Sequence, residues 1–353
     1  MRADHLQHRA IPRKGRQAEP AASQQRDSPH FAKTNPLTLP LPAPNQVTAP
    51  ASRETNPLAP NRRRGLIQVH IAAFLVGFPG LFSKWLDLNP GMITLGRTAV
   101  GSIALLIFLL CGRKSLRIHN RRDLGLLILS GIGLAVNWLA FFQSIKVSTV
   151  AVGLLAFSTF PLFVTFLEPL FYREKLHWFD IATALVVMIG LSFVAPIFDF
   201  GNRFTQGILW GIGCALACAM VSLVSRAIVQ KYPPITVTFY QQAFGAIFTL
   251  PALATFHGKI DGHTTALLLL LGILFTAVAG TLVTASLQHI KAQLASVVIA
   301  LEPVYGIIFA MILLHEIPSP RTAFGGALIC GAVFWASYQH ARLIDKSAAH
   351  TRP

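Results

Sequence analysis

Ionisable side chains are rare within the long apolar runs of this 353-residue chain, and the few that occur there are the first candidates for chemistry. They are Arg97, Glu168, Glu302 and His70. A charge at the centre of a bilayer costs roughly 2.5 to 3.5 kcal/mol on insertion scales, so such residues serve a function or pair with one another. Arg97 could hold a carboxylate or phosphate group of a solute, or it could form a structural pair with Glu302. Glu302 and Glu168 are candidate proton carriers.

Uncharged polar and aromatic residues in the apolar runs extend this candidate site. Amide and hydroxyl groups supply hydrogen-bond donors and acceptors, and aromatic rings supply flat walls, which together suit a small amphipathic solute. The predicted solute-binding residues are Arg97, Asn137, Trp138, Tyr240, Gln241, Glu302 and Tyr305. For each uncharged residue taken alone, hydrogen bonding between helices is the competing interpretation.

Motifs for enzyme chemistry are missing from the sequence. It contains no HExxH, no P-loop and no nucleophile elbow, and ten of its twelve histidines lie outside the apolar runs. Cys214 and Cys218 share a helix face, but their neighbours are Gly and Ala, so buried packing is favoured over a metal site. We therefore expect no catalytic residue, no cofactor and no metal.

The composition indicates what must position these residues. Only 12% of the chain is charged and 53% is apolar, against about 25% charged in an ordinary soluble domain. Ten apolar runs follow residue 64, each about 18 to 24 residues long, the length of a membrane-spanning helix. The runs cover residues 65–84, 91–111, 124–145, 149–171, 180–198, 206–226, 234–256, 264–287, 292–314 and 321–341. The sequence thus predicts an all-α integral membrane protein with ten transmembrane helices.

The basic residues, which give a net charge of +16, indicate topology rather than nucleic-acid binding. Residues 1–64 hold 11 of the 30 Lys and Arg and ten of the 22 prolines, which predicts a disordered basic tail. A targeting segment or a tail lying on anionic lipid would look similar. In the remaining chain, alternate loops carry 13 and 5 basic residues, which places both termini, including a short tail at 342–353, in the cytoplasm.

The chain matches itself at an offset of 142 residues. Pro161 then meets Pro303 and Glu174 meets Glu316, without a gap between PLFVTFLEPLFYRE and PVYGIIFAMILLHE. We expect two five-helix repeats, at 65–200 and 206–341; because five is odd, the second copy is inverted in the membrane. Matched prolines predict a helix kink in each half near a central binding site, although both kinks could serve packing alone.

Residues 146–190 and 292–331, each with a run of small residues, a central Pro and a closing Glu, resemble the EamA-like branch of the drug/metabolite transporter superfamily. The resemblance implies a ten-helix carrier in the inner or plasma membrane, with both termini cytoplasmic. Such a carrier moves a small organic solute, such as an amino acid, a related metabolite or a drug, by alternating access. On the resemblance alone, export is favoured over uptake.

Alternatives stay open at this point. A phosphorylated-solute or nucleotide-sugar exchanger of the same superfamily is disfavoured, because Arg97 is the single basic residue inside the runs away from their ends. An enzyme embedded in the membrane would need a cluster of acids, bases or a metal, and a passive channel would not need matched kinks. The expected partners are a small-molecule substrate and the lipid bilayer, and no nucleic acid. The sequence leaves open a coupling proton and a homodimer.

Overall fold

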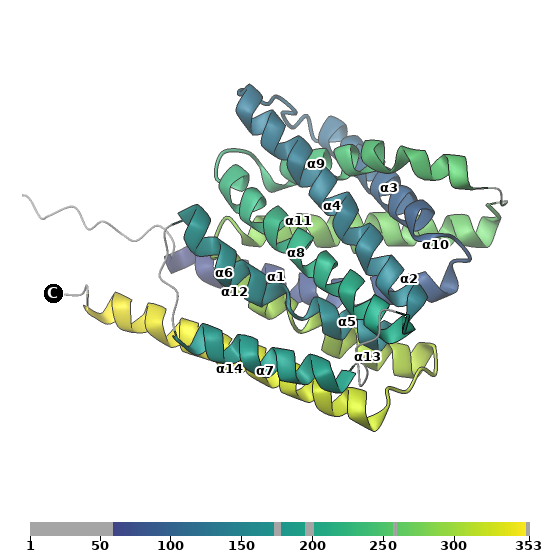
Figure 1. Ribbon diagram of the computed structural model, residues 1–353. Coiled ribbons are helices and arrows are strands. Elements are labelled where there is room, and N and C mark those ends of the chain that lie inside the picture. Colours follow the sequence, from purple (N-terminus) through teal and green to yellow (C-terminus); the bar gives the residue numbers. More distant parts are fainter. Residues whose placement is uncertain (1–58, 173–177, 195–200, 257, 259, 351–353) are drawn as a thin grey trace, which may run out of the picture. The chain divides into compact units, whose positions relative to one another are not determined.

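The computed structural model describes residues 59–172, 178–194, 201–256, 258 and 260–350, and every regular element within them is a helix (Figure 1). Glu174 lies outside the described residues, as does the predicted tail up to residue 58. The first part of the chain contributes α1 (Ala59–Val76), α2 (Pro79–Trp85), α3 (Pro90–Cys111), α4 (Arg121–Val147), α5 (Val150–Phe157), α6 (Phe160–Tyr172) and α7 (Trp178–Val194). The second part contributes α8 (Arg203–Val229), α9 (Pro234–Thr249), η1 (Leu250–Thr255), α10 (Gly262–Gly272), η2 (Ile273–Val278), α11 (Ala279–Ser286), α12 (Ala292–Ile299), α13 (Glu302–Leu313) and α14 (Pro320–His350).

Seven helical stretches in the described part of the chain are long and apolar enough to cross a membrane, so the protein is a multi-pass membrane protein. They are Arg62–Trp85, Pro90–Cys111, Arg121–Val147, Val150–Tyr172, Arg203–Val229, Gly262–Ser286 and Ala292–Leu313. The other three predicted runs are covered by α7, by α9 with η1, and by α14. The count of ten spans therefore stays a prediction.

Two helix ends differ from the predicted boundaries of the tails. Helix α1 begins at Ala59, inside the segment that was predicted as a disordered tail, and α14 continues to His350, beyond the predicted last span. Residues 62–64, three consecutive arginines, lie in the first turns of α1. Arg is a good helix former, and the apolar residues that follow Gly65 extend the same helix.

Short polar residues cap several of the helices at their N-termini. The side chain of Asn89 accepts a hydrogen bond from the backbone N–H of Met92 at 2.8 Å and begins α3. Thr149 caps α5 and Asp261 caps α10 in the same way. Each cap pairs a backbone donor that the helix itself leaves unpaired, so the ends of the apolar runs are set locally by sequence.

Two of the spans are interrupted at matching places. Helix α5 ends at Phe157 and α6 begins at Phe160, one residue before Pro161. Helix α12 ends at Ile299 and α13 begins at Glu302, directly before Pro303. A proline fits the first turn of a helix but not its interior, so both helices restart at these residues. The two interruptions lie 142 residues apart, the offset of the repeat.

Helices of the two halves of the chain pack against one another rather than in separate bundles. Helix α4 contacts α8 and α9, α3 contacts α9 and α10, and α1 contacts α11 and α12. Helices α7 and α14 run side by side (Figure 1). Glycines permit the closest approaches, because a side chain on Gly211 of α8 would collide with Ala156 of α5. The interior is therefore shared between both halves.

Candidate functional site

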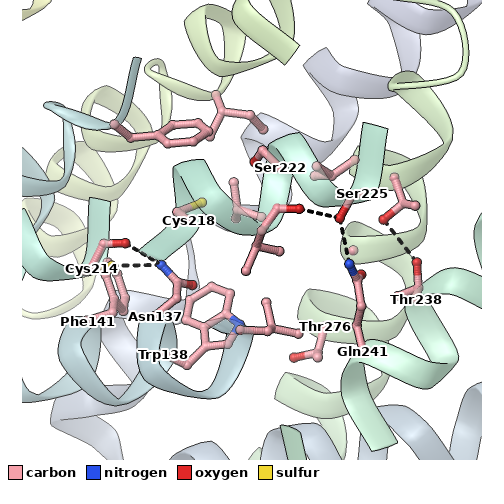
Figure 2. Close-up of a pocket in the computed structure, with 18 of the residues that line it drawn as sticks. Asn137, Trp138, Phe141, Cys214, Cys218, Ser222, Ser225, Thr238, Gln241 and Thr276 are labelled. Carbon is pink, nitrogen blue, oxygen red and sulfur yellow. Dashed lines mark hydrogen bonds between the residues drawn. The ribbon is translucent and has the colours of Figure 1, made fainter. Parts of the chain in front are cut away.

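A cavity of about 120 Å³ lies among helices from both halves of the chain (Figure 2). Five of the seven predicted solute-binding residues line it: Arg97, Asn137, Trp138, Gln241 and Glu302. Phe141, Phe157 and Phe160 add apolar walls. The volume is below the several hundred Å³ of drug-sized ligand pockets, so this conformation leaves room for a compact group.

Arg97 of α3 is fully buried and is held on two sides. Its Nε donates a hydrogen bond to Oγ1 of Thr276 at 3.0 Å, and its Nη2 donates to the backbone oxygen of Phe275 at 3.3 Å. Its Cζ lies 3.3 Å from the centroid of the Trp138 ring, a close cation–π contact. The guanidinium is thus clamped between α4 and the π-helical turn η2.

Glu302 faces the same cavity as the first residue of α13. The residue is 3% exposed, and Arg97 and Glu302 interact electrostatically without forming a direct ion pair. Within the described residues no hydrogen bond to the Glu302 side chain is formed. The structural pair that the sequence left open is therefore not made in this conformation, and both groups remain directed toward the cavity.

Amide side chains complete the polar lining (Figure 2). Asn137 Nδ2 donates to the backbone oxygen of Cys214 at 3.0 Å, which ties α4 to α8. Gln241 Nε2 donates to the hydroxyls of Ser130 and Ser225, both at 2.6 Å. These amides make the interhelical hydrogen bonds of the competing interpretation while they also line the cavity.

Three buried polar atoms at the cavity have no hydrogen-bond partner among the described residues. They are Nη1 of Arg97, Nε1 of Trp138 and Oε1 of Gln242. A buried donor or acceptor without a partner costs roughly 1 to 3 kcal/mol, and more for a charged group. Because all three residues line the same cavity, a bound solute with polar groups would supply the missing partners.

The remaining predicted residues do not line the cavity. The Tyr240 hydroxyl donates to the backbone oxygen of Leu116 at 2.7 Å, which places this side chain against the loop between α3 and α4. Tyr305 packs edge-on against Phe74. His70 is exposed on α1. The two tyrosines thus have contacts that a solute site does not require, and a solute-binding role for either one stays untested.

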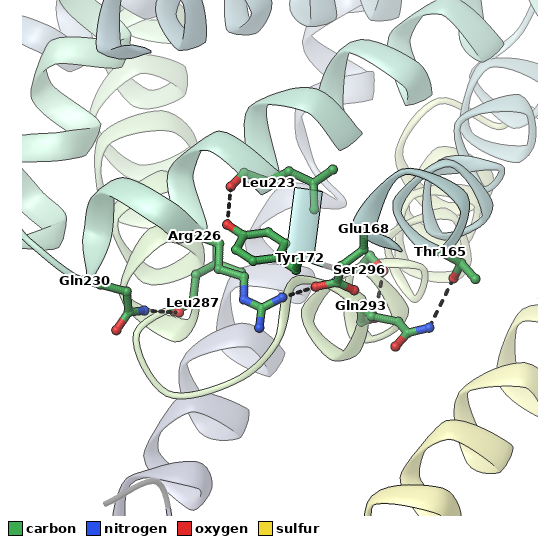
Figure 3. A network of polar contacts seen from close by, with 9 residues as sticks. All are labelled: Thr165, Glu168, Tyr172, Leu223, Arg226, Gln230, Leu287, Gln293 and Ser296. Carbon is green, nitrogen blue, oxygen red and sulfur yellow. Dashed lines mark hydrogen bonds and ion pairs between the residues drawn. The ribbon is translucent and has the colours of Figure 1, made fainter. Parts of the chain in front are cut away.

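Glu168 belongs to a second polar cluster, away from the cavity lining (Figure 3). Arg226 Nη1 of α8 donates to Oε1 of Glu168 on α6, and the Arg226 guanidinium lies 4.3 Å from the centroid of the Tyr172 ring. The Tyr172 hydroxyl donates to the backbone oxygen of Leu223 at 3.0 Å. The cluster therefore ties the end of α6 to the end of α8, one from each half of the chain.

Near this end of α8, two further hydrogen bonds involve α12 and the connection between α11 and α12. Gln230 Nε2 donates to the backbone oxygen of Leu287 at 3.0 Å, and Gln293 Nε2 donates to Oγ1 of Thr165 at 3.4 Å (Figure 3). His289 lies in the connection between α11 and α12. Partial burial, together with the nearby positive charge of Arg64, lowers the pKa of its side chain. The neutral form of His289 is therefore favoured at pH 7.

Thr276 and Gln242 are cavity residues that the sequence analysis did not select. Gln242 stood beside Gln241 in the same polar triplet and could have been chosen from that signal. For Thr276 no signal was available, because a threonine in an apolar run is common and its position depends on the π-helical turn. The pairing of Glu168 with Arg226 joins residues 58 positions apart and has no sequence signature either.

The cavity also follows the internal repeat. Many of its lining residues form pairs separated by 142 positions, one residue from each half. These pairs are Val76 with Cys218, Leu134 with Thr276, Trp138 with Gly280, Phe141 with Val283, Phe157 with Ile299 and Phe160 with Glu302. Matched positions meeting at one cavity indicate that it lies where the two copies face each other.

A multi-pass helical protein whose helices enclose a partly polar cavity has the general build of a membrane transporter. The chain belongs to the EamA-like transporter family, whose model matches residues 63–195 and again 205–338. The predicted family is therefore confirmed.

Curated relatives have transporter names. The chain is 24% identical to the Bacillus subtilis transporter YxxF over 250 residues, which cover 69% of this chain and 79% of the relative. It is 26% identical to a probable terminal-alkyne amino-acid exporter of Streptantibioticus cattleyicolor, covering 67% and 80% of the two chains. It is also 26% identical to an S-adenosylmethionine uptake transporter of Rickettsia bellii, covering 62% and 74%.

A solved crystal structure matches with a TM-score of 0.63 at 21% identity, covering 79% of this chain and 98% of that one, and it shows the fold alone. The family and the relatives together indicate a transporter rather than an enzyme.

Proposed function

We propose that this protein is a secondary transporter that moves a small organic solute by alternating access, and that the central cavity is the solute site. The observation that carries the proposal is the set of unpartnered buried atoms at the cavity, Nη1 of Arg97 foremost. A buried cation that keeps a free donor is costly unless a ligand satisfies it. The matched pairs of lining residues support a site between two inverted repeats.

The chemistry of the cavity favours a compact amphipathic solute. An anionic group of the solute would bind Arg97 and the Trp138 N–H, while an amino or other donor group would bind Glu302 and Oε1 of Gln242. An amino acid or a related metabolite fits this pattern, and two relatives are named for an amino acid and for S-adenosylmethionine. A phosphorylated solute would bring about two negative charges to a cavity with one arginine.

The two helix interruptions and the Glu168 cluster supply the parts that alternating access needs. We place hinges at Pro161 and Pro303, since each helix restarts there. We assign the Glu168–Arg226 pair as a gate at the end of the cavity that the basic residues predict to be cytoplasmic. We further propose that the protein exports its solute through the cell membrane and that both termini are cytoplasmic. A homodimer stays a prediction.

We assign proton coupling to Glu302 in preference to Glu168. Glu302 lies at the cavity without a hydrogen-bond partner in the described part of the chain, so its charge state can respond to the solute. Glu168 accepts a hydrogen bond from Arg226, which holds it as a carboxylate. Glu168 is therefore the gate residue of this proposal.

The experiment begins with a thermal-shift screen of the purified protein against L-amino acids, S-adenosylmethionine, sugar phosphates and nucleotide sugars. Solutes that stabilise the protein are then tested for saturable counterflow in proteoliposomes. Arg97→Gln should abolish counterflow, whereas Arg203→Gln, at an exposed residue outside the cavity, should retain it. Linear uptake without counterflow would indicate a channel, and stabilisation by nucleotide sugars alone would favour the exchanger.

A further inference from the structure

We infer that the π-helical turn η2 is a positioning element for Arg97, with Thr276 as the positioning residue that directs Nη1 of the guanidinium toward an anionic group of the solute. The inference deepens the proposed function and rests on its assignment of Arg97 to the solute site.

The π-helical turn provides two acceptors for one guanidinium. The Thr276 hydroxyl donates to the backbone oxygen of Leu271, five residues earlier, at 2.7 Å, so its hydrogen is used within the turn. Its oxygen is then free to accept the Nε–H of Arg97 at 3.0 Å, and the neighbouring carbonyl of Phe275 accepts Nη2 at 3.3 Å. A π-helical turn within an α-helix is a rare feature that occurs frequently at functional sites.

These contacts determine which N–H donor of Arg97 remains available to a ligand. Arginine presents its donors in a planar, rigid fork, so fixing Nε and Nη2 also fixes the direction of Nη1. The Trp138 ring covers the guanidinium at 3.3 Å from Cζ and prevents it from rotating out of this plane. Nη1 is the guanidinium nitrogen without a partner among the described residues, and Arg97 lines the cavity.

The internal repeat indicates that this arrangement is more than packing. The position that matches Arg97 in the second half is Phe239, and the position that matches Thr276 in the first half is Leu134. Helix α4 passes through Leu134 as a continuous α-helix, without a π-helical turn. Arg97 is thus found only in the first half, and Thr276 with its π-helical turn only in the second half. These two residues, which break the match between the repeats, form a hydrogen bond with each other.

Glycines bring the two elements together. A Cβ atom on Gly272, just before η2, would lie 2.5 Å from Cβ of Val100, and one on Gly101 would lie 3.1 Å from Cγ2 of Thr276. Real Cβ atoms essentially never approach to 2.5 Å, and 3.1 Å is tighter than nine in ten of their contacts, so both glycines let α3 lie close to the turn. The short distance lets Thr276 bond the Nε of Arg97 directly.

The test uses side-chain NMR of the detergent-solubilised full chain labelled with ¹⁵N-arginine. Arg97→Gln assigns the Nε–H resonance of Arg97. Sodium acetate, a carboxylate small enough for the cavity, is then titrated against sodium chloride at equal ionic strength. In the unmodified protein, acetate should shift the Arg97 resonance in a saturable way, which reports an anion at the free donor.

Three threonine variants separate positioning from simple structure. Thr276→Val removes the acceptor and should weaken acetate binding at least tenfold, with a changed Nε–H resonance. Thr276→Ser restores the hydroxyl and should restore both the acetate affinity and the Nε–H resonance. A role of Thr276 in packing alone would not predict this result, because Ser is smaller than Val. Thr281→Val is the matched control, because the Thr281 hydroxyl also donates to a backbone oxygen of η2, that of Ala277, but Thr281 makes no hydrogen bond to Arg97 and lies outside the cavity lining.

Each outcome bears on a different claim. If acetate shifts the Arg97 resonance equally in Thr276→Val and in the unmodified protein, the positioning role is overturned while the anion site of the proposed function stands. If acetate has no effect on the unmodified protein, both fail. If Thr276→Val does not fold, Thr276→Ala and Thr276→Ser are compared instead, and equal acetate affinity in these two variants would overturn the inference.

Discussion

The Glu168–Arg226 ion pair should hold one end of the cavity closed, and Glu168→Gln should release it. Arg226 donates a charge-assisted hydrogen bond to Glu168, whose side chain is 3% exposed, while that of Arg226 is 18% exposed. The substitution keeps the size of the side chain and replaces a hydrogen bond between two charged groups by a weaker one. A bond of this kind is worth about 2 kcal/mol, which corresponds to about a 30-fold change in the ratio of open to closed forms.

The assay uses the thiol of Cys218, which lines the cavity. Cys111, Cys214 and Cys330 are replaced by Ser, and vesicles of defined orientation are treated with a membrane-impermeant maleimide from the side of Arg226. When opening and closing are fast relative to labelling, the labelling rate follows the open population. Glu168→Gln should therefore raise the rate by about 30-fold.

The repeat supplies a matched control for this experiment. Lys84 corresponds to Arg226 and Ala310 to Glu168, so no equivalent ion pair can form between these two positions of the other copy. Lys84→Gln should leave the labelling rate unchanged, and exchanging the charges by Glu168→Arg with Arg226→Glu should lower the rate again. An unchanged rate in Glu168→Gln, or an equal rise in Lys84→Gln, would refute the gate.

Three further substitutions test other parts of the account. Tyr240→Phe removes the 2.7 Å hydrogen bond to Leu116 and should cost about 1 kcal/mol of stability without changing the KM for transport; an altered KM would place Tyr240 in the solute path. Glu302→Gln should transport solute without responding to an imposed pH gradient, and a retained response in vesicles would remove Glu302 from coupling. Gly272→Ala places a methyl group against Val100 and should lower the free energy of unfolding by about 1 to 3 kcal/mol, measured as a lower thermal midpoint, whereas Gly331→Ala, with open space around it, should not.

Residue type and run length were sufficient to predict the helices of this protein, and the resemblance of residues 146–190 and 292–331 was sufficient to predict its family. An apolar run has to form a helix in lipid because its backbone groups have no other partners, and helices cover most of each of the ten runs within the described residues. Charges inside such runs cannot face lipid, so Arg97 and Glu302 had to turn inward, and both line the cavity.

The direction in which each polar side chain points was harder to predict from the sequence. Tyr240 and Gln241 are adjacent in sequence, but consecutive residues of a helix point about 100° apart. Gln241 therefore lines the cavity, whereas Tyr240 reaches the loop at Leu116. Thr276 could not be placed because the π-helical turn inserts an extra residue and changes the face that later residues present.

Counterflow by the Arg97→Gln variant, in proteoliposomes loaded with a solute that stabilises the protein, tests the central claim most directly. The account predicts that Arg97→Gln inserts and remains folded but shows no counterflow, since the cavity would lose its one cation, while Arg203→Gln exchanges solute as the unmodified protein does. Saturable counterflow by Arg97→Gln at the rate of the unmodified protein would show that the solute does not bind at this cavity.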